Sequence, residues 1–330
     1  MNLGLIGAGG YWGRRLLECA VSVDGTRVVG CSAYSNMARL VRGVGDVFGE
    51  KPRPALTLST AELLANPEVD AVIIATPAET HYAIAKEALR SQKHVFVEKP
   101  LCLSSVEAAE LARLAREQGR TLLVDHTYLF SKCLKYMRTK VDEGFLGEPL
   151  FVHSNRNQIG IYRAHGVLWD LAPHDISILT FLFPEEKIVD MSLRRWTHFT
   201  REKDNPGETV ADAAHYSIEF SSALKASGYL SWCHPKWARD LAVVGTKGML
   251  LFENNTTVKA FRCESHLAKV PEKSEWVLHE EHSPDDNPLR NAVIAFRDLA
   301  GRPEGEIPRH LRPEFACSVV ATIEALEKSA

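Results

Sequence analysis

Lys99 stands where a side chain could exchange protons with a bound molecule. It follows Val95–Val97, an apolar run typical of a buried strand in a parallel sheet. Doubly wound sheets bind their ligands at the carboxyl ends of such strands. A partly desolvated ammonium beside a bound cation would have its pKa lowered toward neutrality, which suits a general acid or base. The alternative for Lys99 is an ordinary surface ammonium at a strand end.

Asp170 and His174 form a second pattern with acid–base potential. They are four residues apart within Asp170–Phe183, where we expect a helix, so their side chains share one face. A carboxylate and an imidazole on one face, with an ammonium near them, can hold and transfer protons. The alternative is a helix ion pair, and Asp175 is interpreted as no more than a helix-facing neighbour.

A glycine-rich turn lies between the first predicted strand, Leu3–Ile6, and the first predicted helix, Tyr11–Ala20. Glycines in this position allow a tight turn and a close approach of the backbone to a pyrophosphate at the helix N-terminus. The spacing is one residue off the ideal dinucleotide pattern, and a turn without any ligand is the alternative. The turn residues that could contact a dinucleotide are Gly7, Gly9, Gly10, Tyr11, Trp12 and Gly13.

The end of the second predicted strand, Thr26–Cys31, lacks the carboxylate that usually binds the adenosine ribose. The missing carboxylate removes repulsion against a 2′-phosphate, and Ser32 and Arg39 are the candidate contacts there. Arg39 could equally be a solvated helix charge. We therefore expect NAD(P) as cofactor, with the choice open and a slight lean to NADP.

Elements in the first part of the chain alternate between strand and helix. Apolar strands separated by amphipathic helices predict a parallel sheet that is covered on both faces. Two capping boxes, Ser59–Glu62 and Ser104–Glu107, are expected to open helices. The sequence thus predicts an α/β Rossmann domain, a doubly wound parallel sheet over residues 1–125. Its further elements are the strands Ala71–Ala75 and Thr121–Val124 and the helix Thr80–Arg90.

The remainder, residues 126–330, has longer strands in which apolar and polar residues alternate. This pattern predicts an α+β domain with a large, mainly antiparallel open sheet, whose final helix could pack back on the first domain. Residues 200–210 and 265–287 are expected to be polar loops. The predicted strands are Leu150–Asn155, Ile188–Thr197, Ala213–Phe220, Lys225–Trp232, Leu241–Val244, Met249–Glu253 and Val258–Cys263, and the helices are Ser131–Glu143, Asp170–Phe183 and Leu311–Lys328.

Composition narrows the class of protein. The 330 residues are 45% hydrophobic and carry a formal net charge of −3, which argues against nucleic acid or an anionic membrane as main partner. The apolar stretches are strand-sized, and the seven cysteines contain no C-x-x-C, so a cytoplasmic protein is expected. The 13 histidines show no H-x-x-x-H or H-E-x-x-H spacing and no G-x-S-x-G is present, so neither a metal nor a serine-hydrolase site is predicted.

Three further motifs narrow this general interpretation to a resemblance with one family. They are Ala75–His81 (ATPAETH), Glu98-Lys99-Pro100 and Leu168–Asp175 (LWDLAPHD). With the glycine turn, in this order, they resemble the Gfo/Idh/MocA family of NAD(P)-dependent sugar and polyol oxidoreductases over nearly the whole chain. The resemblance implies six further cofactor contacts, which are Thr76, Pro77, His81, Glu98, Lys99 and Pro100. It also implies a homodimer or homotetramer.

The resemblance also assigns roles to the acid–base residues. Lys99 becomes the principal acid or base. His174 is implied to act as an acid or base or to orient a hydroxyl, and Asp170 to hold sugar hydroxyls or to tune Lys99. The segments Asp125–Phe130, Val167–Ile176 and Ser231–Gly245 resemble members near UDP-N-acetylglucosamine 3-dehydrogenases and related nucleotide-sugar enzymes.

Candidate substrate contacts follow mainly from their position in the chain. A diphosphate sugar would favour cations and an aromatic ring to stack on, although a solvated basic loop is the alternative. His126 could line the nicotinamide pocket or be a satisfied core histidine. The candidates are His126, Arg156, Tyr162, Arg163, His165 and Trp169, together with Lys236, Trp237 and Arg239 from a stretch expected between two strands.

Together these observations predict a dehydrogenase that acts on a CH–OH group of a sugar, with a nucleotide-linked sugar favoured. An inositol or free-sugar dehydrogenase and a sugar ketoreductase stay open as alternatives within the same class. A dinucleotide-binding sensor without catalysis is the alternative from a different class. The exact sugar, the hydroxyl concerned and the direction of reaction are not determined by the sequence.

Overall fold

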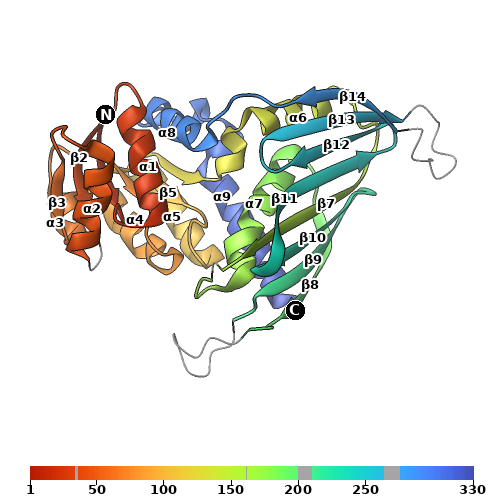
Figure 1. Ribbon diagram of the computed structural model, residues 1–330, viewed down its shortest axis with the longest axis horizontal. Coiled ribbons are helices and arrows are strands. Elements are labelled where there is room, and N and C mark those ends of the chain that lie inside the picture. The colour runs from red at the N-terminus through yellow and green to blue at the C-terminus, as the bar shows by residue number, and fades with distance from the viewer. Residues whose placement is uncertain (34–35, 161, 200–209, 264–275) are drawn as a thin grey trace. The chain divides into compact units, whose positions relative to one another are not determined.

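The computed structural model describes residues 1–33, 36–160, 162–199, 210–263 and 276–330 (Figure 1). The chain forms two compact units. Unit 1 contains Met1–Thr127 and Asn287–Ala321, and unit 2 contains Tyr128–Asp286 and Thr322–Ala330. None of the helices in the described residues is long and apolar enough to cross a membrane.

Unit 1 is built on a six-stranded sheet in which every neighbouring pair of strands is parallel. The order β3-β2-β1-β4-β5-β6 places β1 and β4 at the centre, where the order reverses and where doubly wound sheets bind ligands. The predicted Rossmann architecture is confirmed. Its strands are β1 (Asn2–Ile6), β2 (Arg27–Ser32), β3 (Ala55–Thr57), β4 (Ala71–Ile74), β5 (His94–Glu98) and β6 (Leu122–Asp125).

Helices cover this sheet because its central strands are apolar on both faces; all four residues of β4 are buried. The sequence analysis did not identify β3, α2 or α8. The helices of unit 1 are α1 (Tyr11–Ser22), α2 (Met37–Phe48), α3 (Thr60–Ala65), α4 (His81–Arg90), α5 (Ser105–Glu117) and α8 (Pro288–Leu299), with short 3-10 turns η1 (Ala78–Thr80), η4 (Glu304–Glu306) and η5 (Arg309–Leu311). The 3-10 turn η2 (Thr127–Phe130) and helix α9 (Pro313–Lys328) each contain residues of both units.

The two predicted capping boxes turn out differently. Ser59 accepts a hydrogen bond from the Glu62 backbone at 3.1 Å, but the Glu62 carboxylate binds the Thr57 hydroxyl instead of returning to Ser59. Ser104 precedes α5 without any side-chain cap, so the second capping box is wrong. Serine at an N-cap is favoured but not obligatory, because water can satisfy the first N–H groups of an exposed helix.

Unit 2 contains an eight-stranded sheet in the order β14-β13-β12-β11-β7-β10-β9-β8. Its pairs are antiparallel except for β7 with β10, so the predicted large, mainly antiparallel sheet is confirmed. The strands are β7 (Pro149–Ile159), β8 (Ile188–Trp196), β9 (Ala213–Phe220), β10 (Lys225–Ser231), β11 (Cys233–Gly245), β12 (Gly248–Glu253), β13 (Thr257–Cys263) and β14 (Trp276–His282).

Two helices of unit 2, α6 (Lys132–Asp142) and α7 (Gly166–Leu182), lie against one face of this sheet (Figure 1). Most residues of α7 are buried, including the carboxylates of Asp170 and Asp175. A carboxylate taken out of water must be paired or hydrogen-bonded. The partners of these two groups therefore come from the sheet beneath α7.

Three strand predictions need correction. β7 continues to Ile159, and β11 begins at Cys233, so the stretch with Lys236, Trp237 and Arg239 lies within a strand and not between two. The reason is tertiary, because after a register shift β11 pairs with the extended end of β7. β14 lies in the expected polar loop 265–287, whose residues up to 275 are outside the described part, as are residues 200–209 of the other expected loop.

Candidate active site

The glycine turn of unit 1 leads from β1 into α1 and requires glycine at two positions. Gly7 has φ +91°, and a Cβ on it would overlap the carbonyl oxygen of Ala75. A Cβ on Gly13 would overlap the carbonyl oxygen of Gly7, at a distance that real Cβ atoms essentially never show. The turn is thus as tight as the sequence pattern predicts, despite the irregular spacing.

The N-terminus of α1 has the features of an anion site. Gly10 is the N-cap and offers no side-chain hydrogen bond, and the first turn contains no acidic residue. The first N–H groups of a helix have no partner inside it, and the helix dipole favours negative charge there. Tyr11 and Trp12 are exposed beside this end. These residues fit the pyrophosphate of a dinucleotide, which Gly7, Gly9, Gly10 and Gly13 would let come close to the backbone.

Ser32 ends β2 beside the glycine turn. Its carbonyl oxygen accepts the N–H groups of Gly7 and Ala8, at 2.8 Å and 3.2 Å. Its buried hydroxyl has no hydrogen-bond partner within the described part of the chain. Arg39 is exposed near the start of α2, where Asn36 caps the helix by accepting the Arg39 N–H. An orphaned hydroxyl and an exposed guanidinium fit the ribose end of a dinucleotide.

His81 joins the turns that follow β4 and β5. Its Nδ1 lies 2.8 Å from the carbonyl oxygen of Pro100, and its Nε2 lies 2.9 Å from that of Thr76. The peptide bond between Lys99 and Pro100 is cis. Pro77 begins the short turn η1 next to Thr76. His81 is buried, so in this structure it holds the two turns together beside the candidate cofactor site.

Lys99 lies beside ionisable groups whose charge is suppressed by burial. Burial and the neighbouring Glu98 carboxylate raise the pKa of Asp125 well above its usual range. Burial and the ammonium of Lys99 lower the pKa of His126 to about 3. Asp125 accepts a hydrogen bond from the Thr127 hydroxyl at 3.0 Å. Lys99 therefore lies next to a neutral imidazole and a carboxyl group that burial disfavours in its charged form.

His126 belongs to the interior of unit 1. Both of its ring nitrogens are buried without a hydrogen-bond partner among the described residues, and its ring meets that of Phe315 edge to face, at 5.9 Å between centroids. Of the two alternatives from the sequence, the burial of His126 favours a core histidine over a solvent-facing substrate contact.

Asp170 of α7 is held by Gln158 of β7 and by Trp232, which lies between β10 and β11. The indole Nε1 of Trp232 donates to Asp170 Oδ2 at 3.0 Å, and Gln158 Nε2 lies 3.4 Å from the same oxygen. His174, one turn further along α7, meets the ring of Tyr128 edge to face at 5.0 Å between centroids. The predicted carboxylate and imidazole are thus both fixed by aromatic neighbours.

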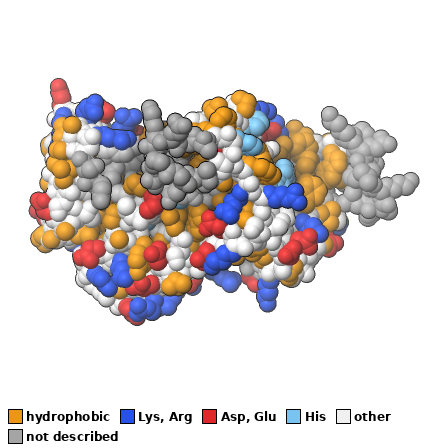
Figure 2. Space-filling model, turned by 90° about the horizontal axis from the view of Figure 1, so that it is seen from below, with side chains coloured by type: hydrophobic (Ala, Val, Ile, Leu, Met, Phe, Trp, Pro, Cys, Tyr) orange, Lys and Arg blue, Asp and Glu red, His pale blue; other side chains and the backbone are white. Residues whose placement is uncertain are grey.

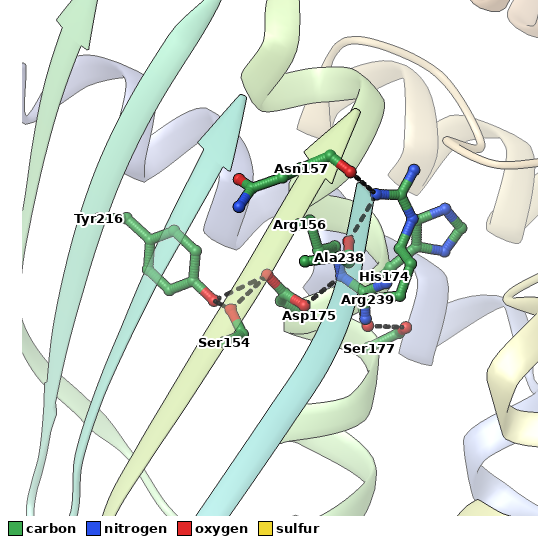
Figure 3. A network of polar contacts seen from close by, with 9 residues as sticks. All are labelled: Ser154, Arg156, Asn157, His174, Asp175, Ser177, Tyr216, Ala238 and Arg239. Carbon is green, nitrogen blue, oxygen red and sulfur yellow. Dashed lines mark hydrogen bonds and ion pairs between the residues drawn. The ribbon is translucent and has the colours of Figure 1, made fainter. Parts of the chain in front are cut away.

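Asp175 is more than a neighbour on the helix. Its carboxylate forms an ion pair with Arg156 and accepts hydrogen bonds from Ser154 at 2.7 Å and from Tyr216 at 3.1 Å (Figure 3). Asp175 and Arg156 are 0% and 1% exposed. The predicted substrate contact Arg156 thus lies in the core, and its guanidinium stacks 4.9 Å from the ring centroid of Tyr128.

The other predicted substrate contacts are more dispersed. Trp169 is buried and donates to Glu327 at 3.1 Å, so its ring is a core group in this structure. Tyr162 packs against Trp232, at 5.6 Å between ring centroids. Trp237 is exposed and stacks with Arg239. Arg163 and Lys236 are exposed, and His165 is half-buried at the N-cap of α7.

Five residues of this site were missed by sequence reasoning, namely Tyr128, Ser154, Gln158, Tyr216 and Trp232. One signal was present for Gln158: Ser154, Arg156 and Gln158 alternate along β7, so these polar side chains share one face of the strand. On the buried face of a sheet, three polar residues in a row predict a polar network.

One cluster of potential metal ligands lies elsewhere in unit 2. The ligand atoms of His198, Asp212 and Cys233 lie within 4.8 Å of one another, although the residues are far apart in sequence. One oxygen of Asp212 already accepts the backbone N–H groups of His198 and Phe199, at 2.9 Å and 2.7 Å. We assign no metal to this cluster, and the expectation of a metal-free site stays a prediction.

Fold and site together define a two-unit protein of the dinucleotide-binding Rossmann class. Residues 1–126 match the model of the oxidoreductase family with NAD-binding Rossmann fold, and residues 134–251 match that of the GFO/IDH/MocA C-terminal domain. The chain belongs to the Gfo/Idh/MocA family.

Two curated relatives that are more than 30% identical to the protein align with part of the chain. An uncharacterised oxidoreductase of Synechocystis is 36% identical over 234 residues, which are 64% of this chain and 62% of the relative. Another from Escherichia coli, YdgJ, is 32% identical over 188 residues, 53% of this chain and 51% of the relative. The chain thus aligns with roughly half to three-fifths of the length of these relatives.

Solved structures match the fold over the whole chain. A 3-ketoreductase from Actinomadura kijaniata, in complex with NADP and TDP-benzene, has a TM-score of 0.82 at 21% identity, covering 100% of this chain and 98% of that one. UDP-N-acetylglucosamine 3-dehydrogenase from Acidithiobacillus ferrooxidans has a TM-score of 0.77 at 22% identity, covering 100% and 97%. At these identities the likeness concerns the fold.

Proposed function

We propose that this protein is an NAD(P)-dependent oxidoreductase that acts on a secondary alcohol or ketone of a sugar, and that the sugar is nucleotide-linked. The observation that carries the proposal is the tight glycine turn on the uncapped α1, which fits a dinucleotide. Asp170 and His174, which are held in place in unit 2 by Trp232 and Tyr128, also support the proposal. The nucleotide link is supported by the two structural neighbours named above.

Each acid–base residue has a role in this proposal. A bound nicotinamide supplies the hydride acceptor for oxidation or the donor for reduction. Lys99 takes the hydroxyl proton when the alcohol is oxidised and returns it when the ketone is reduced. Asp170 accepts hydrogen bonds from sugar hydroxyls, and His174 orients the reacting hydroxyl or shares its proton.

All proposed cofactor contacts belong to unit 1, and NADP is proposed as the favoured cofactor. An exposed Arg39 and the absence of a carboxylate at the end of β2 support this preference. The proposed contacts are Gly7, Gly9, Gly10, Tyr11, Trp12, Gly13, Ser32, Arg39, Thr76, Pro77, His81, Glu98, Lys99 and Pro100.

We also propose a homodimer or homotetramer. Large apolar side chains are exposed on strands of the eight-stranded sheet, and the pairing register places Phe151 of β7 and Leu278 of β14 on the same face. Exposed apolar groups on a sheet face favour association. In the face drawn in Figure 2, hydrophobic side chains are mixed with Lys, Arg, Asp and Glu. Light scattering that shows a monomer at micromolar concentration would overturn this proposal.

The test begins with titration of the purified protein with NADH and NADPH, followed by a screen of UDP-sugars, free sugars and inositols at saturating cofactor. We expect turnover on a UDP-sugar, and Lys99→Ala to lower kcat by about 100- to 10,000-fold while the cofactor still binds. Lys135→Ala, which removes an exposed lysine of α6, is the matched control. Cofactor binding without turnover on any of these substrates would contradict the proposal and favour a sensor.

A further inference from the structure

Two arginines face each other across the sheet of unit 2. Arg239 of β11 is the register partner of Arg156 of β7 in an antiparallel pair, so the two side chains share one face of the sheet. Like charges directly opposite one another destabilise such a pair. A sheet that keeps this arrangement needs compensating negative charge for both guanidinium groups.

Only one of the two cations has a negative partner within the described residues. Asp175 compensates Arg156, as Figure 3 shows. Arg239 instead donates to neutral acceptors: the carbonyl oxygens of Asn157 and Ala238, both at 2.8 Å, and the amide oxygen of Gln158. In the described part of the chain no carboxylate oxygen lies within 4.0 Å of its guanidinium nitrogens.

The environment of Arg239 makes its charge unfavourable. The side chain is half-buried, and its burial, followed by the cation of Arg156, lowers its pKa from the usual range, although the nearby carboxylates of Asp170 and Asp175 act in the opposite direction. The ring centroid of Trp237 lies 5.2 Å from the guanidinium and covers part of it. The Arg156 guanidinium binds Asp175 through Nε, whereas its Nη1 is buried without a hydrogen-bond partner among the described residues and adds to the positive potential. An anion would be stabilised here more than at an exposed arginine.

Gln158 connects this positive site to the proposed catalytic machinery. Its amide oxygen accepts from Arg239, and its amide nitrogen lies 3.4 Å from Asp170 Oδ2. One amide side chain thus separates the guanidinium from the carboxylate that we propose binds sugar hydroxyls. An anionic group bound by Arg239 would belong to the same molecule as those hydroxyls.

We propose that Arg239 binds an anionic group of the sugar substrate, a phosphate or a carboxylate, and so selects charged sugars over neutral ones. This inference rests on the proposed function, because it assigns the bound molecule to the site of Asp170. The two anion sources share their chemistry, since a guanidinium binds phosphate and carboxylate oxygens in the same bidentate manner.

The test measures binding directly, so that it does not depend on turnover. Calorimetry of the full chain, with NADPH present, uses UDP, UDP-glucose, glucuronate and glucose as probes. We expect Arg239→Gln to weaken binding of the charged probes by about 10- to 100-fold and to leave glucose unchanged. Arg239→Lys, which keeps the charge, should retain part of the affinity. The preferred probe, UDP or glucuronate, identifies the phosphate or the carboxylate.

Controls separate this inference from the proposed function and from misfolding. Lys225→Gln removes an exposed cation of β10 in the same sheet and should bind all probes as the wild type does. Arg239→Gln removes one of two facing cations but also loses hydrogen bonds to Asn157, Ala238 and Gln158, so circular dichroism and a melting curve are used to establish that the variant is folded. Charged probes that bind Arg239→Gln as tightly as wild type, or that do not bind wild type at all, would overturn the inference. Arg239-dependent binding without turnover on any sugar would instead overturn the proposed function alone.

Discussion

Arg156 of β7 and Asp175 of α7 form an ion pair that is buried on both sides, with side-chain exposures of 1% and 0%. The pair anchors α7 to the sheet in the turn that carries His174. Ser154 and Tyr216 complete the hydrogen bonds of the Asp175 carboxylate. Because neither charge can reach water, each group depends on the other for its solvation.

Asp175→Asn should therefore lower the free energy of unfolding by about 3–5 kcal/mol, since it leaves the Arg156 guanidinium buried without its counter-charge. Urea unfolding monitored by circular dichroism measures the change. The matched control is Glu219→Gln, which breaks an exposed ion pair with Lys225 and should cost less than about 1 kcal/mol. Equal effects of the two substitutions would refute the role assigned to the buried pair.

Arg39 is expected to distinguish the two cofactors. Arg39→Gln should weaken NADPH binding by about 10- to 100-fold through the loss of a charged contact to the 2′-phosphate, with little change for NADH. Fluorescence titration with both reduced cofactors measures the two affinities. Arg42→Gln, an exposed arginine of the same helix, should change neither. The assignment fails if Arg39→Gln affects NADH and NADPH alike.

His126 should make the stability of the protein dependent on pH. Its pKa in the folded state is about 3, so it stays neutral there, while in the unfolded chain it gains a proton as the pH falls below its ordinary value. Protonation of the unfolded state then favours unfolding progressively between the unfolded and folded pKa values. Relative to His126→Gln, the wild type should lose about 2 kcal/mol of stability between about pH 7 and about pH 5.

The measurement for His126 is urea unfolding of wild type and His126→Gln at both pH values. His153→Gln, at an exposed histidine of β7, should show the same pH dependence as wild type. A His126→Gln variant that loses as much stability on acidification as the wild type would mean that His126 titrates normally.

Gly13→Ala tests the geometry of the cofactor turn. The added methyl group would collide with the carbonyl oxygen of Gly7, so the turn must shift. We expect a loss of about 1–3 kcal/mol in stability and a loss of detectable NADPH binding. Gly305→Ala meets no atom within 4 Å and should leave both properties unchanged. Normal cofactor binding by Gly13→Ala would argue that the dinucleotide does not approach this turn.

Local pattern was sufficient for much of the fold. Apolar runs and their spacing predicted β1, β4 and β9 and the change from parallel to antiparallel sheet, because side-chain periodicity follows directly from backbone geometry. It was not sufficient for β14, whose residues are mostly exposed, or for the first part of β11, whose charged residues resemble a loop. Those strands exist because a neighbouring strand supplies their hydrogen bonds.

The sequence by itself determined the class of this protein: a glycine turn between strand and helix, the Lys99 motif, and Asp170 four residues before His174. These are local features, and their chemistry depends on residue type and short spacing. Only the tertiary structure decided which charges are compensated. Asp175 meets Arg156 across 19 residues and Tyr216 across 41, and Trp232 meets Asp170 across 62. No periodicity encodes such contacts, because they arise when a helix is packed on a sheet whose strand order is not the order of the chain.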